Sequence, residues 1–570
     1  MESTALSEGR PERLKEPTVE NSQNRKQPSI LLTFLISPPD LSSLNLINSS
    51  KRIAMTVLPT YPNQEGRLFP VQNRTESFWL SERDPLLQNA HTTPELPRSA
   101  DVVIVGSGLT GAMMSYYMYE NARKAGRDIK VVMLEADEFC GGATARNGGH
   151  CKPMTIFGYR AEAAKHGPEI ANQLLTFEAA ALQQYAAIVK REDIDCDMHV
   201  TRAFDVCFRK EDAEAGKKDY EARKAAWGED MAKHDLRVVE DPKELEALTG
   251  VRGGYWGASY PAGHLWPYKL ASALTHISLS RGLNFQTHTP ALSLDRSPSQ
   301  PGEWVVNTPR GSITATSIIV ATNAYTSGFL PEFKSLIFPV RGTACSITPA
   351  PSHSHGSIPG PIKYTYGFRH GPGEVDYMIP RQGRGRIPGS GDRSLILGGA
   401  KGCFLGDIDQ WYNNKNDNEQ MPRARKYFEG FMKKYFVGWN GNEHGNVDRV
   451  WSGILGYSSD LLPYVGEVPN KPGVFICAGF TGHGMPRIPG CTAALSSLAI
   501  SYLSNGSTTP DANRAFRRAL PQPYWLTKER FESKINLIKA AMGQGGQAKL
   551  DTTNQADEAV LAAKMGKAKL

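Results

Sequence analysis

The chain has 570 residues, of which 40 % are hydrophobic and 22 % charged, a composition ordinary for a globular protein with a substantial core. Its length corresponds to about three to four domain-sized units, or two larger interleaved ones. The formal net charge of +7 is small for this length and indicates neither nucleic acid nor an acidic membrane as a partner. The eight cysteines form no CxxC pair, which predicts reduced thiols in an intracellular protein and no metal site.

The N-terminal part is predicted to be an extension followed by an arm. Residues 1–54 are rich in Ser, Pro and Glu and are predicted to be disordered, so that Met55 is a candidate for the true start. Residues 55–98 are predicted to form an extended arm, for which the run Phe78-Trp79-Leu80 supplies the anchor. No apolar run approaches the about 18 residues that a membrane-spanning helix needs.

The C-terminal part, residues 526–570, is predicted to be a helix followed by a flexible polar tail. It ends in Ala-Lys-Leu at 568–570, a conservative variant of the S-K-L peroxisomal address. We therefore expect a peroxisomal import receptor as a partner and the peroxisome as the location, with the cytoplasm as the alternative. A solvated tail that ends this way by chance is the competing interpretation.

A βαβ unit is predicted after the arm. "ADVVIVGSG" (100–108) has the continuous apolar character of a buried parallel strand and ends in a glycine turn. Residues 109–126 follow as a helix that Gly126 stops, and 128–136 ("DIKVVMLEA") form the next strand. The length matches one unit of a parallel sheet.

The rest of the chain alternates between helical and strand patterns. A helix is predicted over 168–190, with Pro168 in its first turn, and the charged stretch 209–249 is predicted to be a solvated helical face. Short strands are predicted within 283–322. Segments 381–393 and 407–425 are expected to be loops. A last strand at 473–479 leads through a glycine turn to a helix over 491–503.

The first glycine turn carries a dinucleotide fingerprint, Gly106-x-Gly108-x-x-Gly111. The first glycine permits a sharp turn, the second lets the backbone approach a pyrophosphate, and the third lets helix and strand pack closely. Glu135 ends the following strand, where a carboxylate accepts hydrogen bonds from ribose hydroxyls and disfavours the 2′-phosphate of NADP. These residues together predict a bound dinucleotide.

Three further segments favour FAD over NAD. "GGATARNGGH" (141–150) crowds four glycines into ten positions, as expected where a flavin and its pyrophosphate lie against bare backbone amides. "IIVATNAYT" (318–326) and "AGFTGHGM" (478–485) are further strand ends followed by small residues. An ordinary glycine-rich loop explains the first segment alone. Three such turns from distant parts of the chain suit one long, extended cofactor.

Six segments follow one another along the chain: "VVIVGSGLTGA", "LEA", "GGATARNGGH", "ATNAYT", "PVRG" and "WSGILGYSSDLLPYVG…GVFICAGFTGHGM". In this order they resemble the FAD-dependent amine oxidoreductases of the D-amino-acid oxidase superfamily, and most of all its γ-glutamylputrescine oxidoreductase-like branch, with glycine and sarcosine oxidases as relatives. The resemblance implies an α/β fold, in which a discontinuous Rossmann-type FAD-binding domain carries a mixed-sheet α+β substrate domain. We expect the FAD-binding domain at 99–165, 262–335 and 445–525, and the substrate domain at 166–261 and 336–444.

The resemblance also implies the residues that hold the cofactor. Those expected at the pyrophosphate and ribose are Gly106, Ser107, Gly108, Leu109, Thr110, Gly111, Glu135 and Ala136. Those expected along the phosphates and the flavin are Gly142, Ala143, Thr144, Arg146, Asn147, Gly148 and Gly149. Ala291 is expected at the adenine, and Thr322 and Asn323 at the cofactor edge. Gly479, Thr481, Gly482, His483, Gly484 and Met485 are expected to point a helix start at the flavin pyrimidine, where a positive helix end stabilises the negative charge that hydride transfer creates.

In such enzymes hydride passes from the carbon next to nitrogen of a small amine or amino acid to flavin N5, and O2 or another acceptor reoxidises the flavin. The protein positions and desolvates the amine, so no catalytic triad is expected. Arg341 is the candidate for gripping an anionic substrate group, with a structural ion pair as the alternative. His150 and His483 are the other catalytic candidates, with cofactor packing as the alternative. Trp266, Tyr377 and Trp451 are candidates for the pocket wall or for the core.

Two departures from the relatives limit this interpretation. The cysteine and the histidine that tether flavin in some relatives are absent near Trp451 and at Arg146, so we expect dissociable FAD. The strand "SLILGGA" (394–400) lacks the lysine that often assists oxygen in oxidases, and Lys401 lies just past it. This argues against O2 as acceptor, whereas the peroxisomal-type ending argues for it, and we favour an oxidase.

The sequence is also compatible with two other functions. One is a flavin dehydrogenase or oxidase that acts on an alcohol or a specialised metabolite. The other is a non-catalytic protein that binds a partner and uses FAD structurally.

Overall fold

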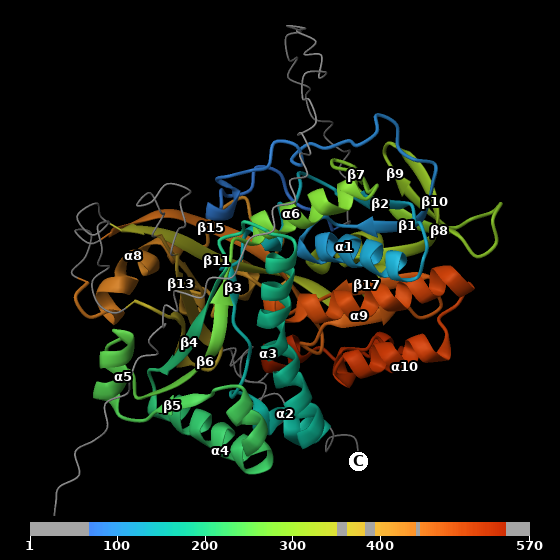
Figure 1. Ribbon diagram of the computed structural model, residues 1–570. Helices are drawn as coiled ribbons and strands as arrows, with labels where there is room; N and C mark the ends of the chain where they lie inside the picture. Colours follow the sequence, from blue (N-terminus) through green and yellow to red (C-terminus); the bar gives the residue numbers. More distant parts are fainter. Residues whose placement is uncertain (1–67, 350–361, 382–393, 440–444, 543–570) are drawn as a thin grey trace, which may run out of the picture. The chain divides into compact units, whose positions relative to one another are not determined.

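The computed structural model describes residues 68–349, 362–381, 394–439 and 445–542 (Figure 1). The predicted extension 1–54, most of the expected loop 381–393, and the Ala-Lys-Leu ending lie outside these ranges. Within the described residues, no helix has the length and apolar character to cross a bilayer. Nor do the His, Cys, Asp and Glu side chains of these residues form a cluster that could hold a metal ion.

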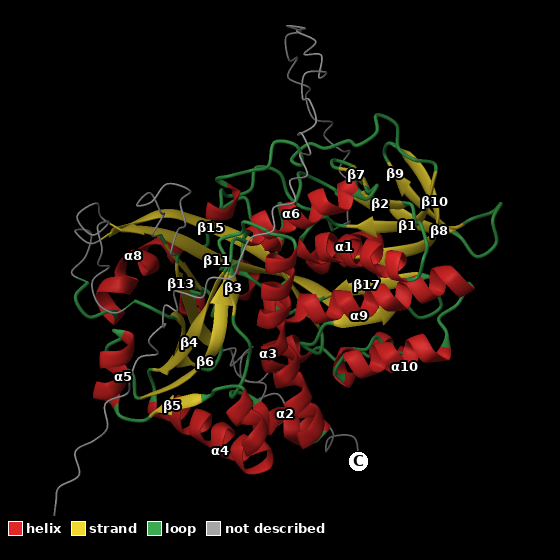
Figure 2. Ribbon diagram, in the orientation of Figure 1, coloured by secondary structure: helices red, strands yellow, loops and turns green. Residues whose placement is uncertain are grey.

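The first sheet is mixed (Figure 2). Its strands lie in the order β16 (Tyr464–Glu467), β17 (Val474–Ala478), β10 (Gly311–Val320), β1 (Ser99–Val105), β2 (Val131–Leu134) and β7 (Asn284–Gln286). Its centre, β17, β10, β1, β2 and β7, is the predicted parallel part, with β16 antiparallel at one edge. β8 (Ser293–Arg296) and β9 (Trp304–Thr308) continue from β10 as an antiparallel hairpin. β1 lies parallel to β10 on one side and to β2 on the other, as the βαβ pattern predicts.

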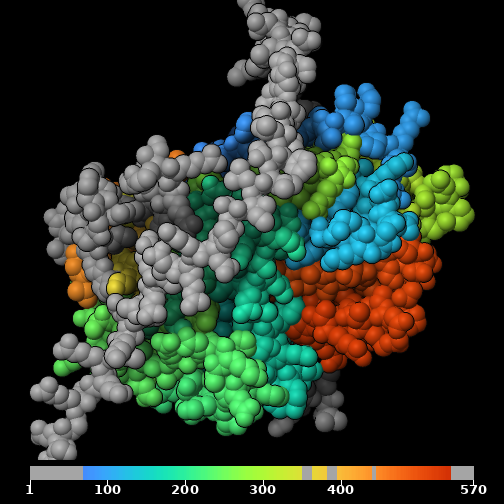
Figure 3. Space-filling view, in the orientation of Figure 1, coloured from blue at the N-terminus to red at the C-terminus, as the bar shows by residue number. Residues whose placement is uncertain are grey.

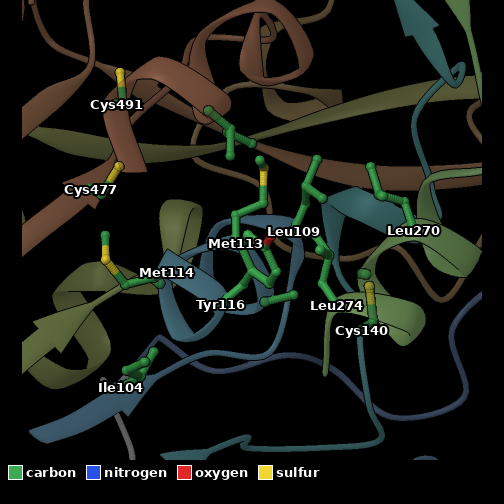
Figure 4. Packing of buried hydrophobic residues seen from close by; sticks show 14 of the residues in the cluster. Ile104, Leu109, Met113, Met114, Tyr116, Cys140, Leu270, Leu274, Cys477 and Cys491 are labelled. Atoms are coloured by element: carbon green, nitrogen blue, oxygen red, sulfur yellow. The ribbon is translucent and has the colours of Figure 1, made fainter. Parts of the chain in front are cut away.

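Both faces of this sheet are buried, which explains why its strands have continuous apolar sequences. Val102 and Ile104 of β1 enter one core, and Val103 and Val105 enter the core on the opposite face, as strand alternation requires. Helices α1 (Leu109–Lys124), α6 (Pro267–Ser280) and α9 (Gly484–Asn505) supply side chains to the first core. Figure 4 shows Met113 of α1 between Leu270 of α6 and Cys491 of α9.

The second sheet is mixed and mainly antiparallel. Its order is β15 (Gly445–Ser458), β11 (Ile337–Pro349), β14 (Leu395–Gly398), β13 (Glu374–Pro380), β12 (Thr365–Gly371), β4 (His199–Cys207), β6 (Trp256–His264) and β3 (His150–Cys151), with β5 (Arg237–Val239) beside β6. β12 and β4 run parallel, and the other neighbours run antiparallel.

Two segments that were expected in the FAD-binding domain pair in the second sheet. Strand β15 was expected in the FAD-binding domain, but it pairs with β11 from Ile337↔Ser458 to Pro349↔Gly445 in the second sheet. The short strand β3 and the end of β6 also belong to that sheet. An apolar pattern indicates that a strand is buried but does not indicate which strand it pairs with. The local sequence therefore could not predict the sheet to which β15 and β3 belong.

The remaining helices cover the sheets or connect them. They are α2 (Tyr159–His166), α3 (Pro168–Arg191), α4 (Lys210–Lys233), α5 (Pro242–Thr249), α7 (Thr326–Phe329), α8 (Ala424–Tyr435), α10 (Pro510–Ala519), α11 (Lys528–Phe531) and α12 (Leu537–Met542). The short 3-10 helices are η1 (Phe78–Leu80), η2 (Ala143–Ala145), η3 (Asn323–Tyr325), η4 (Pro331–Phe333), η6 (Lys401–Cys403), η7 (Ile408–Gln410) and η8 (Gln522–Tyr524). The charged stretch 209–249 is two helices separated by β5, and α3 begins at Pro168 as predicted.

Helix α9 begins at Gly484, earlier than the predicted start at 491. Pro489 lies inside it and lacks the N–H that would bond the carbonyl of Met485, four residues earlier. The hydroxyl of Tyr185 in α3 donates to this Met485 carbonyl at 2.8 Å. The hydrogen bond from Tyr185 thus replaces the one that Pro489 cannot donate. From the sequence alone, this proline predicts that the helix begins after it. Figure 3 shows α9 and α10 at the surface beside α1.

Candidate active site

The site is built where the parallel strands of the first sheet end. β1 and its two neighbours end in register, because Val105 lies opposite both Leu134 and Val320. Gly106 then donates its amide to the Leu134 carbonyl at 2.8 Å, and Ala321 donates to the Val105 carbonyl at 2.9 Å. Ligands of open parallel sheets bind at this carboxyl edge.

The fingerprint glycines are required by geometry. Gly106 has φ +106°, and a Cβ there would lie 2.8 Å from the carbonyl oxygen of Ala321. A Cβ on Gly111 would lie 1.9 Å from the carbonyl oxygen of Gly106. The helix therefore starts close enough to the strand for its first amides to face a ligand only because side chains are absent.

A cavity of about 1280 Å³, counted to its open mouth, follows these turns. We call it the glycine cavity. Its lining includes these predicted cofactor residues: Gly106, Ser107, Gly108, Leu109, Thr110, Glu135, Ala136, Gly142, Ala143, Thr144, Asn147, Ala291, Thr322, Asn323, Gly482, Gly484 and Met485. Segments that are hundreds of residues apart in sequence thus surround one elongated space.

Four predicted cofactor residues support this cavity from behind instead of lining it: Gly111, Gly149, Gly479 and Thr481. Asn323 accepts hydrogen bonds at Oδ1 from the amides of Gly479 (3.0 Å) and Phe480 (3.3 Å), which ties η3 to the turn before α9. Gly148 and Arg146 line a second cavity.

The predicted ribose carboxylate is held in place by its neighbours. Oε2 of Glu135 accepts from the amide (2.9 Å) and the hydroxyl (2.7 Å) of Ser107, and Oε1 accepts from the amide of Asp137 at 3.1 Å. Glu135 lines the glycine cavity. These bonds fix the carboxylate at the strand end, where a ribose would meet it.

Sequence reasoning missed several residues of the glycine cavity. Tyr325 and Phe329 line it from the segment after β10, and Phe69, Pro70 and Arg74 line it from the N-terminal arm. The hydroxyl of Tyr325 is buried and has no partner among the described residues, and burial raises the pKa of this phenol. An unpaired buried hydroxyl is a group that a polar ligand would satisfy. Tyr325 was part of a quoted motif, but only its neighbours were selected.

A second cavity of about 1380 Å³ adjoins the first. The two cavities share the wall residues Ala143, Asn147, Ile454, Leu455, Gly482 and Met485. The charged residues that line the second cavity are Arg146, Lys152, Arg341 and Lys401, and we call it the basic cavity. No carboxylate occurs in its lining, as far as the structure describes the chain.

Lys152 is the main residue of the basic cavity that the sequence did not reveal. Its ammonium lies 2.9 Å from Oδ1 of Asp205, and 16 % of the lysine side chain is exposed. Burial lowers the pKa of Lys152, against the opposing effect of Asp205. For Asp205, burial acts to raise the pKa, but Lys152 and Arg369 outweigh it and lower the pKa. The ammonium is therefore anchored from behind by a carboxylate while it borders the cavity.

The two predicted arginines are mostly committed to the protein. Arg341 lies in β11 and is 1 % exposed; Nη1 donates to Glu419 at 3.0 Å and Nη2 to the Gln420 carbonyl at 3.1 Å. Its Nε is buried without a partner among the described residues. Arg146 donates to the carbonyls of Gly141 and Ser452, and burial lowers its pKa to about 10. Arg341 thus has both of its proposed features, a structural ion pair and a place in the cavity wall.

The two predicted histidines differ in their surroundings. His150 is half-buried in β3, and desolvation together with the charge of Lys152 lowers its pKa well below the ordinary value, so it is neutral at pH 7. Its Nε2 has no partner among the described residues. His483 precedes α9 and borders the same cavity, and its Nδ1 lies 3.2 Å from Oε2 of Glu178.

Glu178 in α3 is the carboxylate behind His483. It is buried and also pairs with Nε of Arg487 at 2.7 Å and accepts from the Met154 amide at 2.8 Å. Burial would raise its pKa, but Arg487 and His483 outweigh burial and lower the pKa to about 2. Because Nδ1 of His483 faces this carboxylate, Nε2 is the nitrogen left on the side of the basic cavity.

Among the predicted aromatic residues, Tyr377 lines the basic cavity. Trp266 and Trp451 are buried in the first core, and Trp451 donates its Nε1–H to the Arg146 carbonyl at 2.8 Å. Trp451 therefore supports the glycine-rich loop from behind.

The described residues fit FAD. The glycine cradle admits a pyrophosphate, the carboxyl group of Glu135 stands at the expected ribose position, and the start of α9 borders both cavities. The glycine cavity, which fits the cofactor, adjoins a second cavity with which it shares six wall residues.

Comparison with known proteins agrees with this geometry. The sequence model of one family, described as FAD dependent oxidoreductase (DAO), matches residues 101–498. The chain is 28 % identical to gamma-glutamylputrescine oxidoreductase of Escherichia coli, over 73 % of this chain and 86 % of that protein. It is 22 % identical to glycine oxidase of Bacillus subtilis, over 74 % and 98 %. The crystal structure of glycine oxidase from Geobacillus kaustophilus has the same fold, with a TM-score of 0.55, 19 % identity, and coverage of 76 % of this chain and 99 % of that one. The chain belongs to the D-amino-acid oxidase family of FAD-dependent oxidoreductases, and its cofactor is FAD.

Proposed function

We propose that this oxidoreductase oxidises the carbon–nitrogen bond of a small amine that carries a carboxylate or another anionic group. The bound FAD would accept hydride, which is two electrons and one proton, from the carbon next to nitrogen. The imine product then hydrolyses in water to a carbonyl compound. The supporting relatives are, by name, an oxidase of glycine and an oxidoreductase of γ-glutamylputrescine.

The observation that carries this proposal is the shared wall of the two cavities. A substrate in the basic cavity would lie next to a cofactor in the glycine cavity, because Asn147, Gly482 and Met485 border both. The basic cavity also has a charged lining of one sign. Lys152 and Arg341 would attract an anionic group, since charge-assisted hydrogen bonds are about twice as strong as neutral ones.

His483 is proposed to prepare the amine. A protonated amine cannot release hydride from the neighbouring carbon, because its nitrogen lone pair is occupied. In this step one N–H bond of the ammonium breaks, its electron pair stays on nitrogen, and the proton joins Nε2 of His483. Glu178 would hold the imidazole in the required tautomer through Nδ1. His150, neutral and unpaired at Nε2, would orient the substrate by a hydrogen bond.

O2 is proposed as the acceptor, with hydrogen peroxide as its product. The expected strand at 394–400 carries no lysine, but Lys152 and Lys401 both border the basic cavity, so the argument against oxygen loses its basis. Peroxisomal import through the Ala-Lys-Leu ending stays a prediction, since these residues are outside the described ranges.

Anaerobic bleaching of the flavin absorbance tests the proposal. Holoprotein is mixed with matched pairs of substrates, each an amino acid and the amine that lacks its carboxylate. We expect bleaching by at least one amino acid and at least about 100-fold weaker saturation by its partner amine. Admission of air should restore the colour and release peroxide. Bleaching by alcohols alone would contradict the proposal, and bleaching by amines that air does not reverse would replace O2 by another acceptor.

A further inference from the structure

We propose that the N-terminal segment 69–79 is part of the FAD site and acts as a clasp that retains the cofactor. We call this segment the clasp. It lies before residue 101, where the match to the family begins. The sequence predicted only that the arm is anchored by its aromatic residues, and none of its residues was a candidate for binding.

Side chains of the clasp bond to carbonyls of the glycine-rich loop 141–149. Arg74 donates from Nη1 to the Gly141 carbonyl at 3.0 Å, and Ser77 donates from its hydroxyl to the Ala145 carbonyl. Trp79 donates from Nε1 to the Asn147 carbonyl at 2.5 Å. These donors turn three loop carbonyls toward the clasp. Because carbonyls and amides point in different directions along such a loop, the arrangement favours amides on the cofactor side.

Thr75 connects the same loop to the strand that borders both cavities. Its carbonyl accepts from Nη1 of Arg146 at 2.7 Å, and its hydroxyl accepts from the Ser452 amide in β15 at 2.9 Å. Its amide donates to the Asp417 carbonyl at 2.9 Å. The clasp thus couples the glycine-rich loop to the second sheet.

The clasp also forms part of the cavity wall itself. Phe69, Pro70 and Arg74 line the glycine cavity. Among the described lining residues, Arg74 alone carries a positive charge, and its ion pair with Asp137 holds the guanidinium in place. The pyrophosphate of FAD is dianionic, so this cavity has one charged side chain, besides helix and loop amides, to compensate it.

Packing makes the clasp rigid enough for this role. Trp79 is 1 % exposed, and its ring lies 5.6 Å from that of Trp266. A Cβ on Gly149 would lie 2.8 Å from the Trp79 ring, so that glycine admits the ring against the loop. Trp266 in turn donates its Nε1–H to the Trp79 carbonyl at 2.9 Å. The clasp is anchored on one side by aromatic packing and contacts the cavity on the other.

The test measures FAD affinity and needs no substrate. Full-length apoprotein of Arg74→Gln, Arg74→Lys and Ser77→Ala is titrated with FAD, whose fluorescence changes on binding, and the melting temperature of each apoprotein is recorded. Arg83→Gln is the matched control, because Arg83 lies on the same arm but pairs with Glu76 and Glu138 and touches neither loop nor cavity.

We expect the dissociation constant of FAD to rise about 10- to 50-fold in Arg74→Gln, less in Arg74→Lys, and about 3- to 10-fold in Ser77→Ala, with no change in Arg83→Gln. Unchanged affinity in both Arg74→Gln and Ser77→Ala overturns the proposal, whatever the melting temperatures do, because a purely structural arm would alter only those. Should Arg74→Gln fail to fold, Ser77→Ala decides, since it deletes a single hydroxyl.

Discussion

The glycine cavity and the basic cavity share a wall but bind by opposite means. Within the described lining, the first has glycines of the strand-end turns and one cationic side chain, Arg74, whereas the second has four cationic side chains, Arg146, Lys152, Arg341 and Lys401. Backbone amides suit a cofactor that all members of a family share, whereas side chains can be exchanged without altering the fold. The shape of the first cavity therefore depends on glycines at the strand-end turns, whereas the second differs from it mainly in its positive charge.

The largest expected effect is on the FAD affinity of the glycine cavity. Gly111→Ala would place a Cβ 1.9 Å from the Gly106 carbonyl oxygen and push α1 away from β1. We expect at least about a 1,000-fold loss of FAD affinity, so that purified protein is colourless. Visible absorbance after desalting measures this.

Gly126→Ala is the control at the other end of the same helix. Gly126 has φ +63° but nothing within 4 Å of a built Cβ. That variant should keep its yellow colour and lose about 1 kcal/mol of stability through backbone strain alone. Equal flavin content in both variants would refute the role of close packing.

The backbone side could be predicted from sequence because steric exclusion leaves a visible mark. Gly106 and Gly111 stand where no other residue fits, and the strand before them and Glu135 after them complete a pattern of fixed spacing. The pairing partner of a strand leaves no comparable pattern in its local sequence. Residues 445–458 were expected in the FAD-binding domain, and local sequence does not say that they form a strand that pairs with β11 in the second sheet.

Most side chains of the basic cavity could not be predicted for the same reason. Lys152 lies two residues after His150, and the spacing of two places both on one face, which was the signal available. Its importance depends on Asp205, which is 53 residues away in sequence and adjacent only in the folded sheet. Tyr377 was named as a candidate, but its strand was not predicted. The role of the clasp could not be predicted from the sequence because its side chains donate to backbone carbonyls, which every residue has.

The next effect, about 100-fold, concerns the charge of the basic cavity. Lys152→Met removes an ammonium that we propose to bind the anionic group, so KM for a carboxylate-bearing substrate should rise about 100-fold while kcat changes little. Steady-state turnover in air over a range of substrate concentrations measures the two separately. The double variant Lys152→Met/Asp205→Asn also removes the buried carboxylate charge, which the single variant leaves with Arg369 and the Tyr260 hydroxyl as its partners. If the double variant recovers the wild-type KM, the single effect reflects the charge of Asp205, and the assignment of Lys152 fails.

A smaller effect, about 10-fold, is expected from Glu178→Gln. With a pKa of about 2, Glu178 is ionised throughout the working range and supports the imidazole of His483. The bleaching rate at pH 7 should fall about 10-fold without it. This deficit should shrink as pH rises, since more substrate amine then arrives without its proton. A deficit that stays constant with pH would assign Glu178 to packing alone.

The last effect concerns stability, with no change expected in activity, and it involves a carboxylate in α2. Glu162 is buried, and burial raises its pKa to about 7. That value lies above the ordinary 4.5. The contribution of Glu162 to the free energy of unfolding is therefore fully present below about pH 4.5 and is lost as the pH rises through 7. Glu162→Gln should therefore raise the free energy of unfolding by up to about 3 kcal/mol at pH 8 and by little at pH 4. Thermal melts at both pH values check this. Unchanged bleaching kinetics would separate Glu162 from Glu178, and slowed kinetics would extend the charge network of the basic cavity into α2.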